Sequence, residues 1–128
     1  YAWWTRQKHG GGLSRLWGWF RMATAETNIM NAIMVALSAA GCLMWRQNTG
    51  AMRDPSGRLV RYGLCTGSSD LVGVAHDGVF LAVEVKTPTG RVSPAQTAFI
   101  AAVRRHGGRA GVARSVEDAL AIAFPPPG

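Results

Sequence analysis

The chain has 128 residues, which is enough for one domain with its own core and no help from disulfides or a structural metal. It carries 14 basic and 7 acidic residues, a formal net charge of +7, and 12 of the basic residues are arginines. Arginine suits phosphate because its planar guanidinium donates two parallel hydrogen bonds, so the composition favours an anionic partner. No run of about 18 apolar residues occurs, which excludes a membrane-spanning helix from the expected elements.

The cysteines and histidines give no sign of a metal site of their own. Cys42 and Cys65 lack CxxC spacing, and we expect both to be free thiols in a reducing compartment. His9, His76 and His106 are scattered without ligand spacing.

Residues 1–21 form an extension rich in Trp, Arg and Gly that holds four of the five tryptophans. Its pattern has neither a helical nor an alternating period, and Met22 after it is typical of a natural start. We therefore expect residues 1–21 to be upstream sequence outside the domain. The alternative is an arm that stacks on bases or docks on a partner subunit. Without residues 1–21 the count is 10 basic and 7 acidic residues, or +3. We expect the folded domain over residues 22–123 and a Pro-rich tail over residues 124–128.

The first predicted element is a helix from Thr24 to about Ala40. Ile29, Ile33 and Leu37 recur at helical spacing and define its buried face. Glu26 lies in its first turn, at the edge of that face. A glutamate there is explained equally well as a favourable partner of the helix dipole.

Two strands are predicted next, over residues 42–47 and 58–62, and we expect them to pair as a hairpin. Turn signals at residues 48–50 and 54–57 separate them. Several arginines fall in or near this hairpin and are candidate phosphate contacts, although a solvated edge strand explains them nearly as well. They are Arg46, Arg53, Arg58 and Arg61.

Residues 71–75 and 79–85 favour β-strands and are apolar on both faces, as expected of central strands in a covered sheet. The loop between them decides the register. A two-residue turn would place Asp70 and Glu84 on opposite faces. We predict a three-residue loop with Gly78 in the left-handed conformation, which places Asp70 directly across from Glu84.

Lys86 follows Glu84 on the same face of its strand. Two carboxylates about 5 Å apart repel each other unless a cation lies between them. Oxygen ligands in this arrangement suit Mg²⁺ or Mn²⁺, and a neighbouring lysine can stabilise charge on a phosphate. The alternative is a Glu–Lys surface pair on an edge strand, which leaves the apolar neighbours Val83 and Val85 unexplained.

The segment from Ser93 to Gln96 is a capping box with proline at the first helical position. It predicts a helix over residues 94–106, and capping alone would account for Gln96. Arg104 and Arg105 at the end of this helix are candidate phosphate contacts, or else partners of the helix dipole. A short strand over residues 109–113 and a last helix from Ser115 complete the domain.

The order of elements predicts an α/β, restriction-endonuclease-like three-layer sandwich with a mixed central sheet flanked by helices. Asp70, Glu84-Val85-Lys86 and Glu26 resemble the PD-(D/E)xK nuclease superfamily. The finer pattern resembles its VRR-NUC family, the virus-type replication-repair nucleases. That likeness rests on residues 46–50, 67–71 and 84–86 and on the ending GRVSPAQ over residues 90–96. One departure is Ser69, which stands where the motif has proline.

The resemblance implies that Glu26, Asp70, Glu84 and the backbone carbonyl of Val85 hold Mg²⁺ or Mn²⁺. It implies catalytic roles for Glu26, Asp70, Glu84, Lys86 and Gln96. With the arginine-rich composition it suggests a set of DNA-contacting residues. These are Arg46, Asn48, Arg53, Arg58, Arg61, Arg91, Arg104 and Arg105.

Stand-alone members of this size resemble homodimeric endonucleases that act on branched DNA such as four-way junctions. The expected setting is the cytoplasm of a bacterium or a phage-infected host, with no membrane and no small-molecule cofactor. The alternative function is a non-catalytic nucleic-acid-binding module that retains the nuclease fold. A plain assembly protein is a further alternative.

Overall fold

The computed structural model describes residues 24–127 apart from 48–49 and 63–66. The expected extension over residues 1–21, Asn48 and Cys65 therefore lie outside the described residues. The elements in chain order are α3 (Thr24–Ala39), β1 (Leu43–Arg46), β2 (Gly50–Arg53), β3 (Leu59–Tyr62), β4 (Leu71–Val74), β5 (Phe80–Val85), α4 (Pro94–Arg105), β6 (Arg109–Ala113) and α5 (Val116–Ala123).

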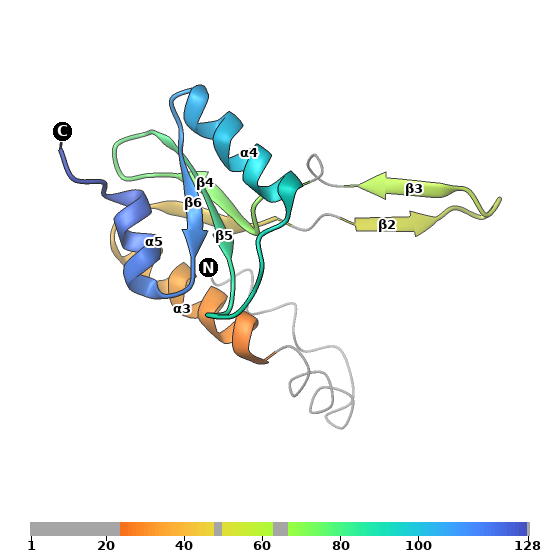
Figure 1. Cartoon of the computed structure of the whole chain (residues 1–128), viewed down its shortest axis with the longest axis horizontal. Helices are drawn as coiled ribbons and strands as arrows, with labels where there is room; N and C mark the ends of the chain where they lie inside the picture. The colour runs from red at the N-terminus through yellow and green to blue at the C-terminus, as the bar shows by residue number, and fades with distance from the viewer. Residues whose placement is uncertain (1–23, 48–49, 63–66, 128) are drawn as a thin grey trace.

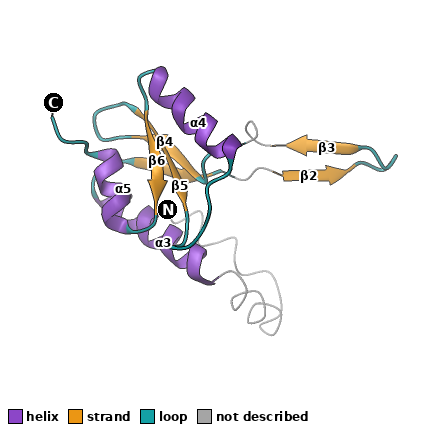
Figure 2. Ribbon diagram, in the orientation of Figure 1, coloured by secondary structure: helices purple, strands orange, loops and turns teal. Residues whose placement is uncertain are grey.

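A four-stranded sheet in the order β1-β4-β5-β6 forms the middle layer. The β1–β4 and β4–β5 pairs are antiparallel, whereas β5 and β6 are parallel, so the sheet is mixed. Helices α3 and α5 lie against one face, and α4 lies against the other (Figure 1, Figure 2). The predicted α/β three-layer sandwich with a mixed sheet is confirmed.

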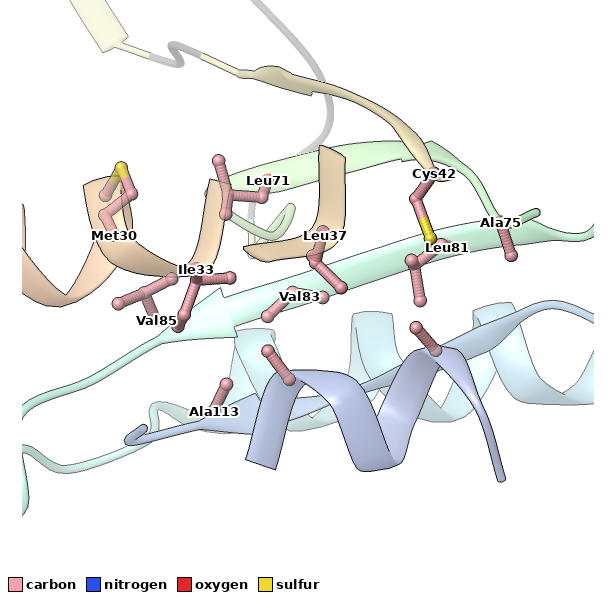
Figure 3. Close-up of a cluster of buried hydrophobic side chains, with 12 residues drawn as sticks. Met30, Ile33, Leu37, Cys42, Leu71, Ala75, Leu81, Val83, Val85 and Ala113 are labelled. Atoms are coloured by element: carbon pink, nitrogen blue, oxygen red, sulfur yellow. The ribbon is translucent and has the colours of Figure 1, made fainter. Parts of the chain in front are cut away.

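The main core lies between the sheet and the pair α3 and α5. Ile33 and Leu37 of α3 are completely buried and face Val83 and Val85 of β5 (Figure 3). These apolar side chains stabilise the fold by roughly 1.5–3 kcal/mol each when fully buried. They also fix β5 in the centre of the sheet, with every second side chain directed to the opposite face.

The second core, under α4, is smaller and consists of Val72, Ala82, Ile100 and Ala110. Two of its four members are alanines, which allow α4 to approach the sheet closely. Glu84 is directed to this face because it alternates with Val83 and Val85 along β5.

The loop between β4 and β5 has the predicted length. Ala75 pairs with Val79, its N–H donating to the Val79 carbonyl at 2.7 Å, so three residues form the loop. Gly78 has φ +85°, the left-handed conformation that this loop requires. The pairing of Leu71 with Val83, continued by one residue, places Asp70 opposite Glu84. The three-residue loop and its register are confirmed.

The expected hairpin between residues 42–47 and 58–62 is wrong. β3 pairs with β2, a strand that the sequence did not predict, and β1 instead pairs with β4 in the main sheet. The short run Gly50–Arg53 lies between two turn signals and has no strand pattern of its own. It forms a strand because a second three-residue loop, ending at Gly57 with φ +88°, reverses the chain beside it.

The Pro-rich tail expected over residues 124–128 begins with a side chain that packs on the domain. The ring of Phe124 stacks on His76 with centroids 4.5 Å apart. Among the described residues, none of the helices has both the length and the apolar character needed to cross a membrane.

Two glycines with the same left-handed conformation allow a matched test of this architecture. Gly78→Ala should lower the free energy of unfolding by about 1–2 kcal/mol, because a side chain is strained at that φ. Gly57→Ala should shift global unfolding much less, since the β2–β3 hairpin contributes to neither buried cluster. No atom beyond the adjacent residues lies within 4 Å of either added Cβ, so only backbone strain differs from the parent. Urea denaturation measures both. Equal losses would show that the hairpin unfolds together with the core.

Candidate active site

Asp70 and Glu84 meet at one end of the sheet, on the face covered by α4. Asp70 directly precedes β4, and its Oδ2 accepts a hydrogen bond of 3.1 Å from the backbone N–H of Val85. This bond attaches the Asp70 carboxylate to the strand that carries Glu84. The structure thus places the two predicted acids side by side.

Glu84 is the most unusual residue of the described chain, because its carboxyl group is buried with 2% exposure. Burial, reinforced by the negative charge of Asp70, raises the pKa of Glu84 to about 8, and the positive charge of Lys86 opposes this shift only in part. Its Oε2 is buried without a hydrogen-bond partner among the described residues. A buried oxygen in this state is stabilised by a proton, a cation or an ordered water.

Gln96 holds the other oxygen of Glu84. Its side-chain N–H donates to Glu84 Oε1 at 2.8 Å, while its own Oε1 accepts from the backbone N–H of Ser93 at 2.9 Å. Because that Ser93 group can only donate, the amide oxygen must face the cap and the NH₂ must face Glu84. The capping box and the contact with the acid, which the sequence presented as alternatives, are both present.

Lys86 lies beside this pair, with Nζ 3.8 Å from Glu84 Oε1. Its side chain is 17% exposed, so the ammonium is partly withdrawn from water. The structure therefore brings together four of the predicted site residues, Asp70, Glu84, Lys86 and Gln96.

Arg114 supports the site, and sequence reasoning missed it. It follows β6, whose parallel pairing with β5 sets it next to Lys86. Its guanidinium donates to the carbonyls of Thr87 at 2.6 Å and Gly90 at 2.7 Å. These bonds close the loop between β5 and α4, and so connect the strand of Glu84 to the helix of Gln96. Only the parallel pairing of β5 and β6 could have indicated this role.

The structure does not place Glu26 in contact with these residues. It lies exposed in the first turn of α3, across the sheet from Gln96 and one helical turn before Met30. Met30 lies near Val85, so Glu26 is at the same end of the sheet as the site (Figure 3). Within the described residues, no three Asp, Glu, His or Cys side chains form a group that could hold a metal.

Ser69 is a second buried polar residue at this place, with 1% exposure. Its hydroxyl has no hydrogen-bond partner in the described part of the chain. It directly precedes Asp70, at the position where the nuclease motif has proline.

The arginines proposed to contact DNA divide into two groups. All seven are exposed. Three of them also have partners within the protein. Arg53 donates to the carbonyl of Gly57 at 2.9 Å, Arg58 lies 3.5 Å from Asp54, and Arg104 donates to the carbonyl of Ala110 at 2.8 Å.

The side chains at this site fit a divalent cation. Asp70 and Glu84 supply carboxylate oxygens, and Glu84 Oε2 has no other described partner. Mg²⁺ is held in many proteins by only one or two carboxylates, the remaining ligands being water and substrate phosphate. Two acids are therefore sufficient, and the Val85 carbonyl and Glu26 are further candidate ligands.

Comparison with known proteins identifies the family of this chain. The VRR-NUC domain family matches residues 16–117, most of the chain. The chain belongs to the VRR-NUC family. It therefore carries a nuclease-type domain, and the resemblance seen in its motifs is confirmed.

Two solved structures are similar to this VRR-NUC chain. A VRR_NUC domain has 23% sequence identity and a TM-score of 0.57, covering 81% of this chain and 100% of its own. A VRR_NUC domain protein has 19% identity and a TM-score of 0.48, covering 77% and 84%. The first of these likenesses supports the fold. None of the curated proteins matches the sequence at a significant level.

The raised pKa of Glu84 predicts a pH-dependent stability in the presence of EDTA. Between about pH 4.5 and 8 the folded protein retains a proton that the unfolded chain releases, so stability falls as the pH rises through this range. Glu84→Gln removes this loss. Its melting temperature should match that of the parent at pH 5 and exceed it by about 5 °C or more at pH 9. Glu117→Gln, at an exposed position, serves as the control. If the melting temperatures of the parent and of Glu84→Gln change with pH in the same way from pH 5 to 9, Glu84 is not the group whose pKa is raised.

The double contact of Gln96 predicts a difference between two cap variants. Ser93→Ala removes the bond from the Gln96 N–H to Ser93 Oγ, and Gln96→Ala removes the reciprocal bond from the Ser93 N–H, each at a cost of about 1 kcal/mol. Gln96→Ala also removes a donor from buried Glu84, and should cost about 1–2 kcal/mol more. Urea denaturation measures both values. Equal losses would mean that Gln96 acts only as a helix cap.

Proposed function

We propose that this VRR-NUC domain is a Mg²⁺- or Mn²⁺-dependent DNA endonuclease that hydrolyses phosphodiester bonds, with a preference for branched DNA such as four-way junctions. The observation that carries the proposal is the buried Glu84 carboxyl, with its unpartnered Oε2, beside Asp70 and 3.8 Å from the ammonium of Lys86. A structural ion pair does not require a second acid or an oxygen without a partner.

The proposed ligands of the cation are Asp70, Glu84 and the backbone carbonyl of Val85, with Glu26 as an additional one. A Mg²⁺ or Mn²⁺ ion bound there would neutralise negative charge on the phosphate and lower the pKa of a water molecule bound to it. Gln96 keeps Glu84 Oε1 in place through its hydrogen bond of 2.8 Å. The Arg114 contacts keep the loop between strand and helix closed around the site.

Lys86 is proposed to orient the attacking water and to stabilise the negative charge that develops on the phosphate. Water adds its oxygen to phosphorus, the bond to one deoxyribose oxygen breaks, and that oxygen takes up a proton. The products are one phosphate monoester end and one hydroxyl end.

The preference for branched DNA and a homodimeric state rest on the family resemblance. Symmetric resolution of a four-way junction needs two cuts. The described residues of one copy of the chain form one candidate active site, which would make one of them. Two copies would supply the pair by symmetry. Sedimentation with and without junction DNA tests the dimer directly.

Cleavage of labelled four-way junction, flap and linear duplex DNA tests the function. We expect cutting with Mg²⁺ or Mn²⁺, none with EDTA, and the fastest cutting on branched substrates. Lys86→Ala and Asp70→Asn should reduce the rate by about 100-fold or more, because each removes a charged group from the site. Glu117→Gln, which changes an exposed carboxylate on α5, should cut at the parent rate.

Metal binding has its own readout in thermal stability. Mn²⁺ should raise the melting temperature of the parent, and should not do so for Glu84→Gln. DNA binding without cutting under any of these conditions would favour the non-catalytic binding module. Full cleavage by Lys86→Ala would contradict the role assigned to Lys86.

A further inference from the structure

The β2–β3 hairpin projects from the domain and contributes neither a strand to the four-stranded sheet nor a residue to the two buried clusters. It forms a separate two-stranded sheet and extends away from the sandwich (Figure 1). From residue 51 to 61 all residues are exposed except Asp54, which is half-exposed, so neither of its faces is covered. An isolated two-stranded ribbon is only marginally stable in water. A structure of this kind indicates a partner.

The charge of the hairpin indicates what kind of partner it binds. Three arginines, Arg53, Arg58 and Arg61, stand against one acid, Asp54. The Asp54 carboxylate is already used within the turn, where Oδ1 accepts hydrogen bonds from the backbone N–H groups of Ser56 and Arg58 and from the Ser56 hydroxyl. These bonds, the one from the Ser56 hydroxyl above all, lower the pKa of Asp54. Asp54 Oδ2 also lies 3.5 Å from Arg58 Nε, so the one acid offsets one of the three arginines and the ribbon remains cationic.

The two faces of the ribbon differ. Ala51 pairs with Arg61, and Arg53 pairs with Leu59, so both paired arginines lie on one face. Met52 and Val60 pair on the other face, with exposures of 62% and 37%. Strands of four residues span about 13 Å, and the major groove of B-DNA, about 12 Å wide, admits a two-stranded ribbon. Apolar side chains can there contact thymine methyl groups while arginines bind phosphates.

Gln47 and Gly67, the nearest described residues outside the hairpin on either side, lie against parts of the candidate active site. Before it, the backbone N–H of Gln47 donates to the carbonyl of Asp70 at 2.8 Å. After it, Gly67 lies so close to the first turn of α4 that an added Cβ would be 2.3 Å from the Ala95 carbonyl and 2.9 Å from the Gln96 nitrogen. The segments that flank the hairpin thus contact the two elements that present Asp70 and Gln96.

We propose that the β2–β3 hairpin is a DNA-binding arm that enters the major groove of the double-stranded segment beside the bond to be cut. Because Gln47 and Gly67, close to its two ends in the chain, contact Asp70 and α4, a duplex bound at the arm would lie beside Glu84 and Lys86. This inference rests on the proposed nuclease function and adds the form of DNA that is held and the element that holds it.

The test is duplex binding in EDTA, measured by fluorescence anisotropy over a range of salt concentrations, so that no cleavage is required. Replacing Arg53, Arg58 and Arg61 together by Gln should lower the affinity by about 30-fold or more at 0.1 M salt. It should also make the slope of log K against log[salt] shallower by about 2–3, because each phosphate contact contributes about 0.9. The matched control replaces the same three residues by Lys, which keeps the charge and should keep the slope.

The outcomes separate this inference from the proposed function. A parent-like slope in the Gln variant, or no duplex binding by the parent, overturns the arm while leaving cleavage by the site intact. A shallower slope in a protein that fails to cut DNA supports the arm and contradicts the nuclease. A third variant with Met52→Ser and Val60→Ser tests a second copy of the chain as the partner. If it sediments as a monomer where the parent is a dimer, and the Gln variant binds duplex normally, the hairpin is a protein interface.

Discussion

A carboxyl group with 2% exposure can remain in a protein only if its surroundings neutralise it or keep it protonated. Glu84 is held in this condition by three independent features. The alternation of β5 directs it under α4, Asp70 lies opposite it, and Gln96 satisfies only one of its two oxygens. The cores on both sides of the sheet keep these parts in place. The raised pKa of Glu84 therefore keeps a proton on this carboxyl at neutral pH, at the place where a cation would bind.

The sequence predicted the elements that depend on local pattern. The periodicity of the first helix, the capping box before α4 and the three-residue loop at Gly78 are all encoded within a few neighbouring residues. So was the alignment of Asp70 with Glu84, since a loop length and a strand period of two determine it. These are the predictions that the structure confirms.

The pairing of distant strands could not be predicted in the same way. The predicted partner of β1 was wrong because the sequence of an apolar strand does not specify which other strand lies beside it. The role of Arg114 depends on the parallel contact of β5 with β6, which no local pattern reveals. The position of Glu26 could not be predicted from local pattern either. Its proposed role as a metal ligand comes from the family motif, and its position depends on how α3 lies across the sheet.

The loop at Gly78 has a wider consequence. Because β4 and β5 are apolar on both faces, hydrophobic packing alone does not distinguish the register that joins Asp70 to Glu84 from the one that separates them. The number of residues between the strands makes that distinction, and the left-handed glycine fixes the number. The length of this loop is therefore as necessary to the site as its acidic side chains. A related sequence with one residue fewer in the loop could keep both acids and still have them on opposite faces of the sheet.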